Sequence, residues 1–242
     1  MPARSYKYLN AITVAFVVVI LLSNIVASIK ITQLELPIFH IKISFAAGLL
    51  FFPASYLIGD LLTEVYGYSK SRQVIWSGFI SLLIANLIIK FLVILPPDPH
   101  WGLQDAYSQI FAIGFRVSIA SMLAFFCGEF CNSFVIAKLK VFTKGKGQAL
   151  RIIGSTCVGE FVDTLLFYPL AFWGDPNFPP GLIAKIMLTN YIVKVLWEIC
   201  VYPLTRKIIA FLKRTENEDY YDVATDFNPF HVLETKDLQD VK

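Results

Sequence analysis

The chain has 242 residues, a net charge of +3, a hydrophobic fraction of 56% and a mean hydropathy of +0.62. This composition is too apolar for an ordinary soluble domain and indicates an integral membrane protein. The apolar runs are long and lack the strict alternation of barrel strands, so we predict an all-α bundle.

Six apolar runs fill most of the chain, and we predict that each forms a transmembrane helix. They cover residues 9–29, 44–66, 71–95, 108–137, 148–173 and 182–205. Each reaches the roughly 20 residues that a helix needs to cross about 30 Å of hydrocarbon. Residues 1–214 are therefore expected to form one membrane domain of six helices.

Two features interrupt this pattern near the first and second runs. Residues 30–43 alternate apolar and polar side chains, which favours a short hairpin or an extended cover. Pro53 lies in the middle of the second run, where it predicts a kink or a broken helix.

Charge is distributed unevenly along the chain. Residues 1–214 carry 19 Lys and Arg against 10 Asp and Glu, a net +9, whereas 215–242 carry 2 against 8, a net −6. The acidic segment lacks a helical apolar stripe, so we expect a polar tail, disordered or loosely docked. The N-terminus and the ends after the second, fourth and sixth runs hold 13 Lys and Arg, and the opposite loops hold 3. Both termini are therefore predicted to be cytoplasmic.

Charged residues inside the apolar runs are the candidate functional groups, because a charge at bilayer depth costs about 3 kcal/mol or more. Their helical spacing gathers polar groups on shared faces. The candidate substrate-binding residues are Glu129, Asn132, Glu160, Asp163, Thr164 and Lys194. The candidate gating or coupling residues are Asp60, Glu64, Arg72, Lys90, Arg116 and Glu198. We expect a polar pocket between the second, fourth, fifth and sixth runs; the alternative is an interhelical ion-pair network that joins Lys194 to Asp163 or Glu160.

A glycine precedes an acidic residue in three similar segments. These are Gly59-Asp60-Leu61, Gly128-Glu129-Phe130 and Gly159-Glu160-Phe161. Glycine at such positions lets a second helix approach closely. Because the second and fifth runs cross in opposite directions, the similarity also predicts an inverted repeat of three plus three helices.

Several function classes lack their sequence signatures. The three histidines lie outside the apolar runs, which argues against an intramembrane His-based or zinc enzyme. The sequence has no Gly-x-x-x-x-Gly-Lys-Ser/Thr phosphate loop and no Gly-x-Ser-x-Gly elbow. We therefore expect neither an enzyme nor an ATP motor, with no metal and no cofactor.

Four segments carry a resemblance to a known family. Residues 60–72 (DLLTEVYGYSKSR), 128–140 (GEFCNSFVIAKLK), 155–167 (STCVGEFVDTLLF) and 191–194 (YIVK) resemble, in order, signatures of the queuosine precursor transporter family, a vitamin-uptake-like family. The resemblance extends from about residue 10 to residue 212. Many members have Gly-Gln where this chain has Gly128-Glu129 and Gly159-Glu160.

The resemblance implies a six-helix, multi-pass protein of the bacterial inner membrane that imports 7-deazaguanine bases, precursors of the tRNA nucleoside queuosine. Such bases include preQ0, preQ1 and queuine. It implies functional roles for Asp163, Thr164 and Lys194, and also for Asp60 and Arg72. No nucleic-acid partner is expected, and the protein is expected to be a monomer or a homo-oligomer.

The leading hypothesis is a secondary transporter or facilitator. The alternatives are a substrate-binding membrane subunit that works with a separate ATPase, a membrane enzyme acting on lipid, and a structural protein.

Overall fold

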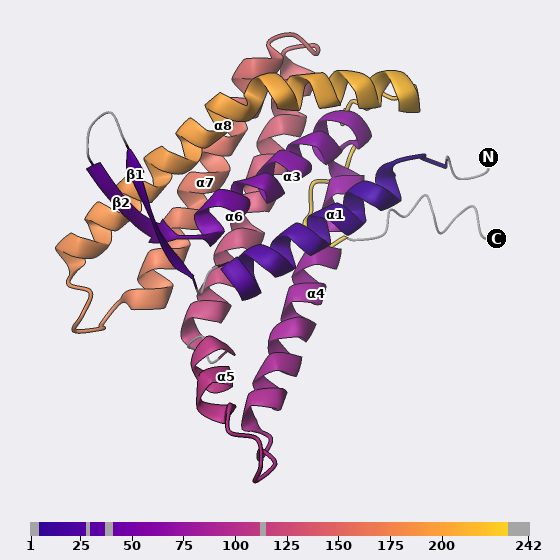
Figure 1. Cartoon of the computed structure of the whole chain (residues 1–242). Coiled ribbons are helices and arrows are strands. Elements are labelled where there is room, and N and C mark those ends of the chain that lie inside the picture. Colours follow the sequence, from indigo (N-terminus) through magenta and orange to yellow (C-terminus); the bar gives the residue numbers. More distant parts are fainter. Residues whose placement is uncertain (1–4, 28–29, 37–40, 112–114, 232–242) are drawn as a thin grey trace.

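The computed structural model describes residues 5–27, 30–36, 41–111 and 115–231. Helices make up most of this part of the chain, which confirms the all-α class. They are α1 (Leu9–Leu21), the π-helix η1 (Leu22–Ala27), α2 (Gly48–Phe51), α3 (Pro53–Tyr66), α4 (Tyr68–Ile94), α5 (Gln104–Phe111), α6 (Phe115–Phe142), α7 (Gln148–Phe172) and α8 (Pro180–Glu216). These helices overlap all six apolar runs (Figure 1), but the start of the second run was predicted wrongly, because residues 44–46 belong to the strand β2 (Ile41–Ala46).

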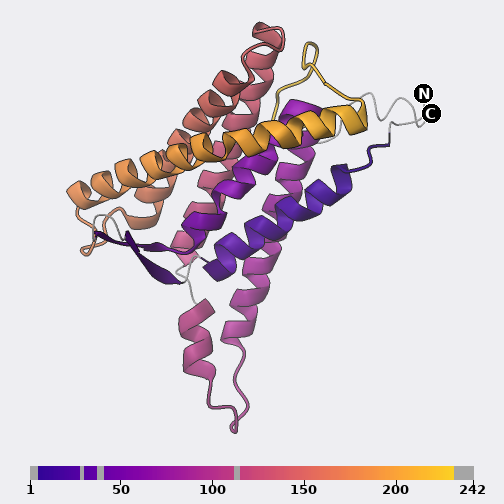
Figure 2. The same ribbon diagram turned by 45° about the horizontal axis from the view of Figure 1, so that its top comes forward.

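The short helix α3 lies at the centre of the bundle. It packs against α1, α4, α6 and α8, while α6 and α7 pack against each other as a helical hairpin. Figure 2 shows α8 crossing the other helices obliquely. Tyr56 of α3, Phe16 of α1 and Phe125 of α6 are buried where these helices meet, and the rings of Tyr56 and Phe125 are 6.2 Å apart. Large aromatic side chains thus fill the centre of the helical core.

Two helices of the described chain are long and apolar enough to cross a membrane. One is Tyr68–Ile94, and the other covers Gln104–Phe142, that is α5 and α6. The helices α1 and α3 have 13 and 14 residues and are shorter than the 18 residues required for such a helix. The longer α7 and α8 contain charged residues that lower their hydropathy. The number of spans, the inverted repeat and the side on which each terminus lies therefore stay predictions.

Two predicted interruptions are present. The strands β1 (Ile31–Leu36) and β2 (Ile41–Ala46) pair antiparallel as a hairpin, with Ile31 opposite Ala46. The second apolar run is broken between α2 and α3, and Pro53 occupies the first turn of α3. Proline has no N–H to donate, so it costs less at the start of a helix than in its interior.

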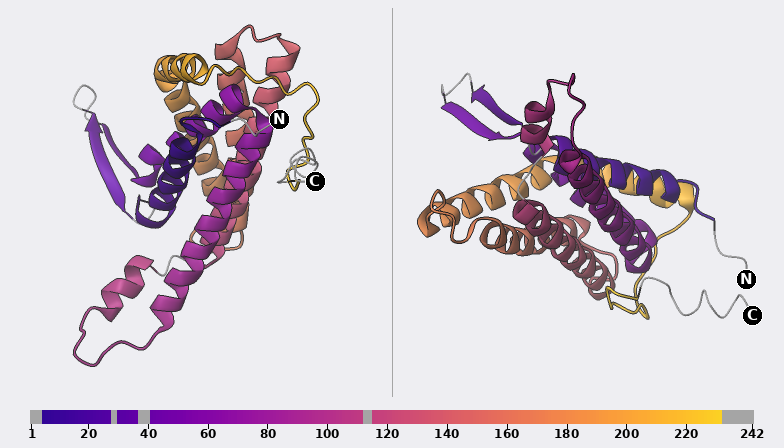
Figure 3. Two further views of the ribbon diagram at one scale, coloured as in Figure 1. Left: turned by 90° about the vertical axis from the view of Figure 1, so that its right-hand side faces the viewer. Right: turned by 90° about the horizontal axis from the view of Figure 1, so that it is seen from below.

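The second half of α4 and the helix α5 extend beyond the other helices (Figure 3). This half of α4 exposes large apolar side chains, among them Ile84, Leu87, Ile88 and Phe91. An apolar surface of this kind is typical of a helix that faces lipid.

The described part of the acidic tail, residues 217–231, lies against the ends of α3 and α4. The backbone N–H of Tyr220 donates to the carbonyl of Val65 at 3.2 Å, and the N–H of Tyr68 donates to the carboxylate of Asp222. Tyr220 also packs against Gly67, whose φ of +85° forms the turn between α3 and α4. At the same end of the bundle, the N–H groups of Lys7 and Tyr8 donate to the carboxylate of Glu216.

Candidate substrate site

Two glycines set the spacing of α6 and α7 at the site. A Cβ placed on Gly128 would lie 2.8 Å from the carbonyl oxygen of Gly159, and a Cβ on Gly159 would lie 2.8 Å from that of Gly128. Any larger residue would therefore meet backbone of the facing helix. The predicted close approach of helices at these glycines is confirmed, and it brings the acidic residues that follow each glycine to one level of the bundle.

Lys194 of α8 bridges two carboxylates of α7. Its Nζ is 2.6 Å from Oε2 of Glu160 and 2.6 Å from Oδ2 of Asp163. Glu160 is 1% exposed and Asp163 is 6% exposed. Nζ also lies 4.8 Å from the ring centroid of Phe52, which joins α2 to α3. The ion pair that we gave as the alternative to a pocket is therefore present, and it joins Lys194 to both carboxylates.

A second set of polar contacts joins α3 to α6. The side-chain amide of Asn132 donates to Oδ1 of Asp60 at 2.7 Å. One helical turn further on, the hydroxyl of Thr63 donates to that of Ser133 at 3.0 Å, and Ser133 also contacts Ser71 of α4. All of these side chains are buried. Hydrogen bonds between polar side chains hold membrane helices together, because hydrocarbon offers no competing partners.

Several buried polar atoms around these contacts have no hydrogen-bond partner within the described residues. They are the hydroxyl groups of Tyr56 and Thr164, Oδ2 of Asp60, Oδ1 of Asn132 and both carboxylate oxygens of Glu129 and Glu198. Buried polar groups are normally paired, and each group left unpaired costs about 1–3 kcal/mol. Helices α3, α6, α7 and α8 thus enclose groups that a polar ligand could satisfy.

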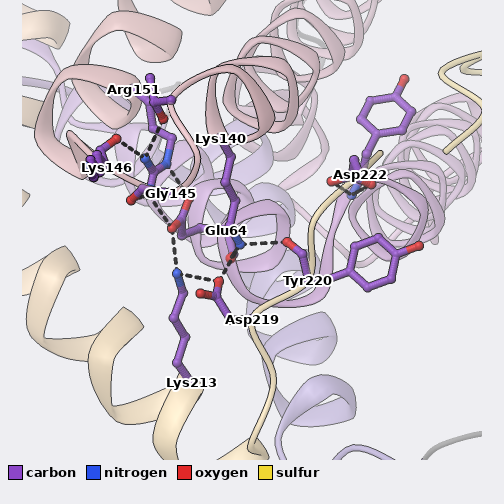
Figure 4. A network of polar contacts seen from close by, with 11 residues as sticks. Glu64, Lys140, Gly145, Lys146, Arg151, Lys213, Asp219, Tyr220 and Asp222 are labelled. Atoms are coloured by element: carbon purple, nitrogen blue, oxygen red, sulfur yellow. Dashed lines mark hydrogen bonds and ion pairs between the residues drawn. The ribbon is translucent and has the colours of Figure 1, made fainter. Parts of the chain in front are cut away.

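A separate ion-pair network lies nearer the tail (Figure 4). Glu64 of α3 accepts hydrogen bonds from Arg151 of α7 and from Lys213 of α8, which also contacts Asp219 of the tail at 2.8 Å. Lys140 of α6 reaches Asp219 at 2.6 Å. Partial burial acts to raise the pKa of Asp219, but the hydrogen bonds and charges of Lys140 and Lys213 outweigh it and hold that pKa below its ordinary value. The network ties the tail to four helices, α3, α6, α7 and α8.

We call the buried polar groups of α3, α6, α7 and α8 around Lys194 the substrate cluster: Tyr56, Asp60, Glu129, Asn132, Glu160, Asp163, Thr164, Lys194 and Glu198. Three predicted gating residues lie outside both this cluster and the network of Figure 4. Arg72 donates to the backbone carbonyls of Asp226 and Asn228 in the tail. Arg116 donates to the carbonyls of Leu170 and Trp173, at 2.7 and 2.6 Å. Lys90 lies on the exposed surface of α4. By contrast, Asp60 and Glu198 lie in the substrate cluster, and Glu64 lies in the network of Figure 4.

Other residues of the substrate cluster and of the network of Figure 4 were not predicted from the sequence. Tyr56 stands four residues before Asp60, so the i, i+4 spacing that gathered the acidic residues could have included it. Arg151, Lys140 and Lys213 served only as flanking positive charges in the prediction of orientation. Within the described residues, no group of three or more His, Cys, Asp or Glu side chains is arranged to hold a metal ion.

The sequence is similar to a family model and to several known proteins. A family model described as "Putative vitamin uptake transporter" matches residues 46–208. The "Queuosine precursor transporter" of Escherichia coli (strain K12) is 26% identical over 200 residues, which cover 82% of this chain and 85% of the relative. No solved structure matches the chain.

Two further relatives are similar over shorter stretches. The "Probable queuosine precursor transporter" of Bacillus subtilis (strain 168) is 29% identical over 136 residues, 56% of this chain and 58% of that protein. The one of Haemophilus influenzae (strain ATCC 51907 / DSM 11121 / KW20 / Rd) is 25% identical over 64% of each chain. The chain thus spans less than two thirds of the length of both of these relatives.

Proposed function

The chain belongs to the vitamin uptake transporter family, and from this we propose that it carries a queuosine precursor, a 7-deazaguanine base, across the bacterial inner membrane. The family is one of transporters rather than enzymes. A transporter binds and releases its substrate unchanged. The polar groups between the helices are therefore assigned to recognition, not to catalysis.

The observation that carries this proposal is the position of Lys194 between Glu160 and Asp163, among buried polar atoms without partners. A guanine-like edge presents neighbouring N–H donors beside a carbonyl acceptor. A carboxylate can accept two such donors, and an ammonium group can donate to the carbonyl. Lys194 has three N–H donors and uses two of them on Glu160 and Asp163. We assign the third to the substrate carbonyl.

Aromatic side chains supply the apolar part of the site. Flat bases are bound by hydrogen bonds at their edges together with stacking on aromatic or apolar side chains. Phe52 lies next to Lys194, and Tyr56 lies one turn further along α3, next to Gly128 and Gly159. We therefore place the base between α3 and α7, with Asp163, Thr164 and Lys194 at its polar edge.

We also propose that α3 couples this site to the network of Figure 4. Asp60 contacts Asn132 within the substrate cluster, whereas Glu64, one helical turn away, holds Arg151 and Lys213. A movement of α3 that follows binding at Asp60 would therefore strain the network at Glu64. This coupling suits a secondary transporter or facilitator, in which substrate binding drives the change of access.

The test is uptake in a bacterial strain that lacks both queuosine synthesis and its own transporter. The chain is expected to restore queuosine in tRNA when preQ0, preQ1 or queuine is supplied. Asp163→Asn should abolish the rescue with normal membrane insertion, and Asp105→Asn on the exposed α5 is the matched control. Absence of rescue by the wild type would refute the substrate assignment. A copurifying ATPase would favour the alternative of a substrate-binding subunit.

A further inference from the structure

The substrate cluster holds many more acidic groups than basic ones. Lys194 is shared by Glu160 and Asp163, so these two carboxylates already exceed the charge of their one ammonium partner. Three more acidic residues, Asp60, Glu129 and Glu198, are each no more than 1% exposed. No Lys or Arg side chain contacts these three within the described residues, where the ion pairs of α7 and α8 involve other carboxylates.

These three residues belong to one group and are not scattered along the bundle. Glu129 lies close enough to Glu198 to interact with it electrostatically, and Asp60 interacts with both. A Cβ placed on Gly59, the neighbour of Asp60, would fall within the carboxylate of Glu129. Three helices, α3, α6 and α8, therefore present their acidic groups to a common volume. We call Asp60, Glu129 and Glu198 the acidic subsite.

Neutral groups with open hydrogen-bonding positions border the acidic subsite. The hydroxyl of Tyr56 is fully buried, lacks a partner and lies against Gly128, the residue before Glu129. The side-chain oxygen of Asn132 is also buried and unpaired, although its amide is held by Asp60. If these polar groups served only to hold the helices together, we would expect their atoms to be hydrogen-bonded to other groups of the protein. Because these oxygens have no hydrogen-bond partner, they favour a ligand that donates hydrogen bonds.

We propose that the acidic subsite binds a protonated alkylamine carried by the substrate, so that the chain prefers an aminoalkyl 7-deazaguanine to a neutral one. This rests on the proposed function. An alkylammonium group has three N–H donors and one positive charge, which match the unpaired oxygens of Asp60, Glu129 and Glu198. It also relieves the cost of carboxylates isolated from water, which is large in an apolar interior. Lys194 and Asp163 remain available for the edge of the base.

The experiment measures the uptake of two labelled bases in competition. The probes are preQ1, whose aminomethyl group is a cation at neutral pH, and preQ0, whose nitrile is neutral. For wild-type chain we expect preQ1 to be taken up at least tenfold better than preQ0. Glu129→Gln keeps the shape of the side chain but removes its charge, and it should lower the preQ1/preQ0 ratio at least fivefold. Glu198→Gln should act in the same direction, whereas Asp105→Asn should leave the ratio unchanged.

The possible results separate this inference from the proposed function. If the wild type takes up neither base, the proposed function fails and the inference fails with it. If both bases are taken up equally, or if Glu129→Gln and Glu198→Gln lower both to the same extent, the function stands and the acidic subsite does not select an amine. Size-exclusion chromatography of each variant in detergent shows whether it is folded, and the two acidic variants serve as independent tests of the ratio.

Discussion

Glu64 and Arg151 form a two-point ion pair between α3 and α7, with Nε of Arg151 2.8 Å from Oε2 and Nη2 2.7 Å from Oε1. Glu64 is fully buried and Arg151 is 2% exposed. Arg151 also donates to the carbonyl of Lys146, in the loop that joins α6 to α7. One guanidinium group thus joins α7 to α3 and to the loop between α6 and α7.

The first prediction concerns this pair. Glu64→Gln leaves Arg151 buried without its anion, and removing one partner of a buried ion pair costs about 3–5 kcal/mol. Arg151→Lys keeps the charge but loses the two-point contact, so its effect should be smaller. Thermal unfolding in detergent measures both, with Asp105→Asn as the control. Equal melting temperatures for Glu64→Gln and wild type would contradict the structural role of the pair.

The second prediction separates two roles for Lys194. Lys194→Ala should lose transport under either role, because Glu160 and Asp163 then share a buried site without a cation. The double variant Asp163→Asn with Lys194→Gln keeps the net charge of this trio at −1, so it should fold. If Lys194 contacts substrate, the double variant is inserted normally and stays inactive, which is the outcome we expect. Wild-type uptake by the double variant would show that the trio is structural.

The third prediction compares two glycines of α7. Gly159→Ala places a methyl group 2.8 Å from the Gly128 carbonyl and from Cβ of Asn132, so α6 and α7 must separate. Overpacking of this kind costs about 1–3 kcal/mol. Gly154→Ala meets no atom within 4 Å and should stabilise α7 by up to about 1 kcal/mol. Melting temperatures that shift in the same direction for both variants would argue against a tight crossing at Gly128 and Gly159.

The fourth prediction concerns pH and the tail. The pKa of Asp219 is held below its ordinary value, chiefly by Lys140 and Lys213 against the opposing effect of burial. Its contribution to stability is therefore fully present above the unfolded-state pKa of about 3.9 and is lost as the pH falls through the lower folded-state value. Asp219→Asn should lower the melting temperature at pH 7. The difference from wild type should shrink on acidification towards pH 3, and a constant difference would contradict this.

The helices and the centre of the site follow from patterns that the sequence shows directly. Apolar runs located the helices, Pro53 predicted the break before α3, and the glycine positions predicted the close contact of α6 and α7. The pairing of Lys194 with Asp163 and Glu160 follows from their similar depth in the bundle. The depth of a residue follows from its position along an apolar run and its helical face follows from the 3.6-residue repeat, so both can be inferred from a single sequence.

The contacts of the tail could not be predicted in this way. Arg72 binds backbone carbonyls of Asp226 and Asn228, and every residue has such an acceptor, so no residue type marks the partner. Arg151 and Glu64 are 87 residues apart in the sequence. Because Arg151 lies next to a loop, it was interpreted only as one of the positive charges that flank the apolar runs. Helix bounds were also misjudged near the start of the chain, where the first apolar run ends in the π-helix η1 and residues 44–46 of the second run belong to β2.

The capping of α1 and α4 has a consequence for the order in which the protein matures. Lys7 and Tyr8, at the start of α1, donate to Glu216, and Tyr68, at the start of α4, donates to Asp222. Ribosomes make the chain from its N-terminus, so both helices exist before their caps have been synthesised. This end of the bundle therefore acquires these hydrogen bonds only after residues 216 and 222 have been made. A ribosome that stalls before residue 216 leaves a chain in which α1 and α4 still begin without these caps.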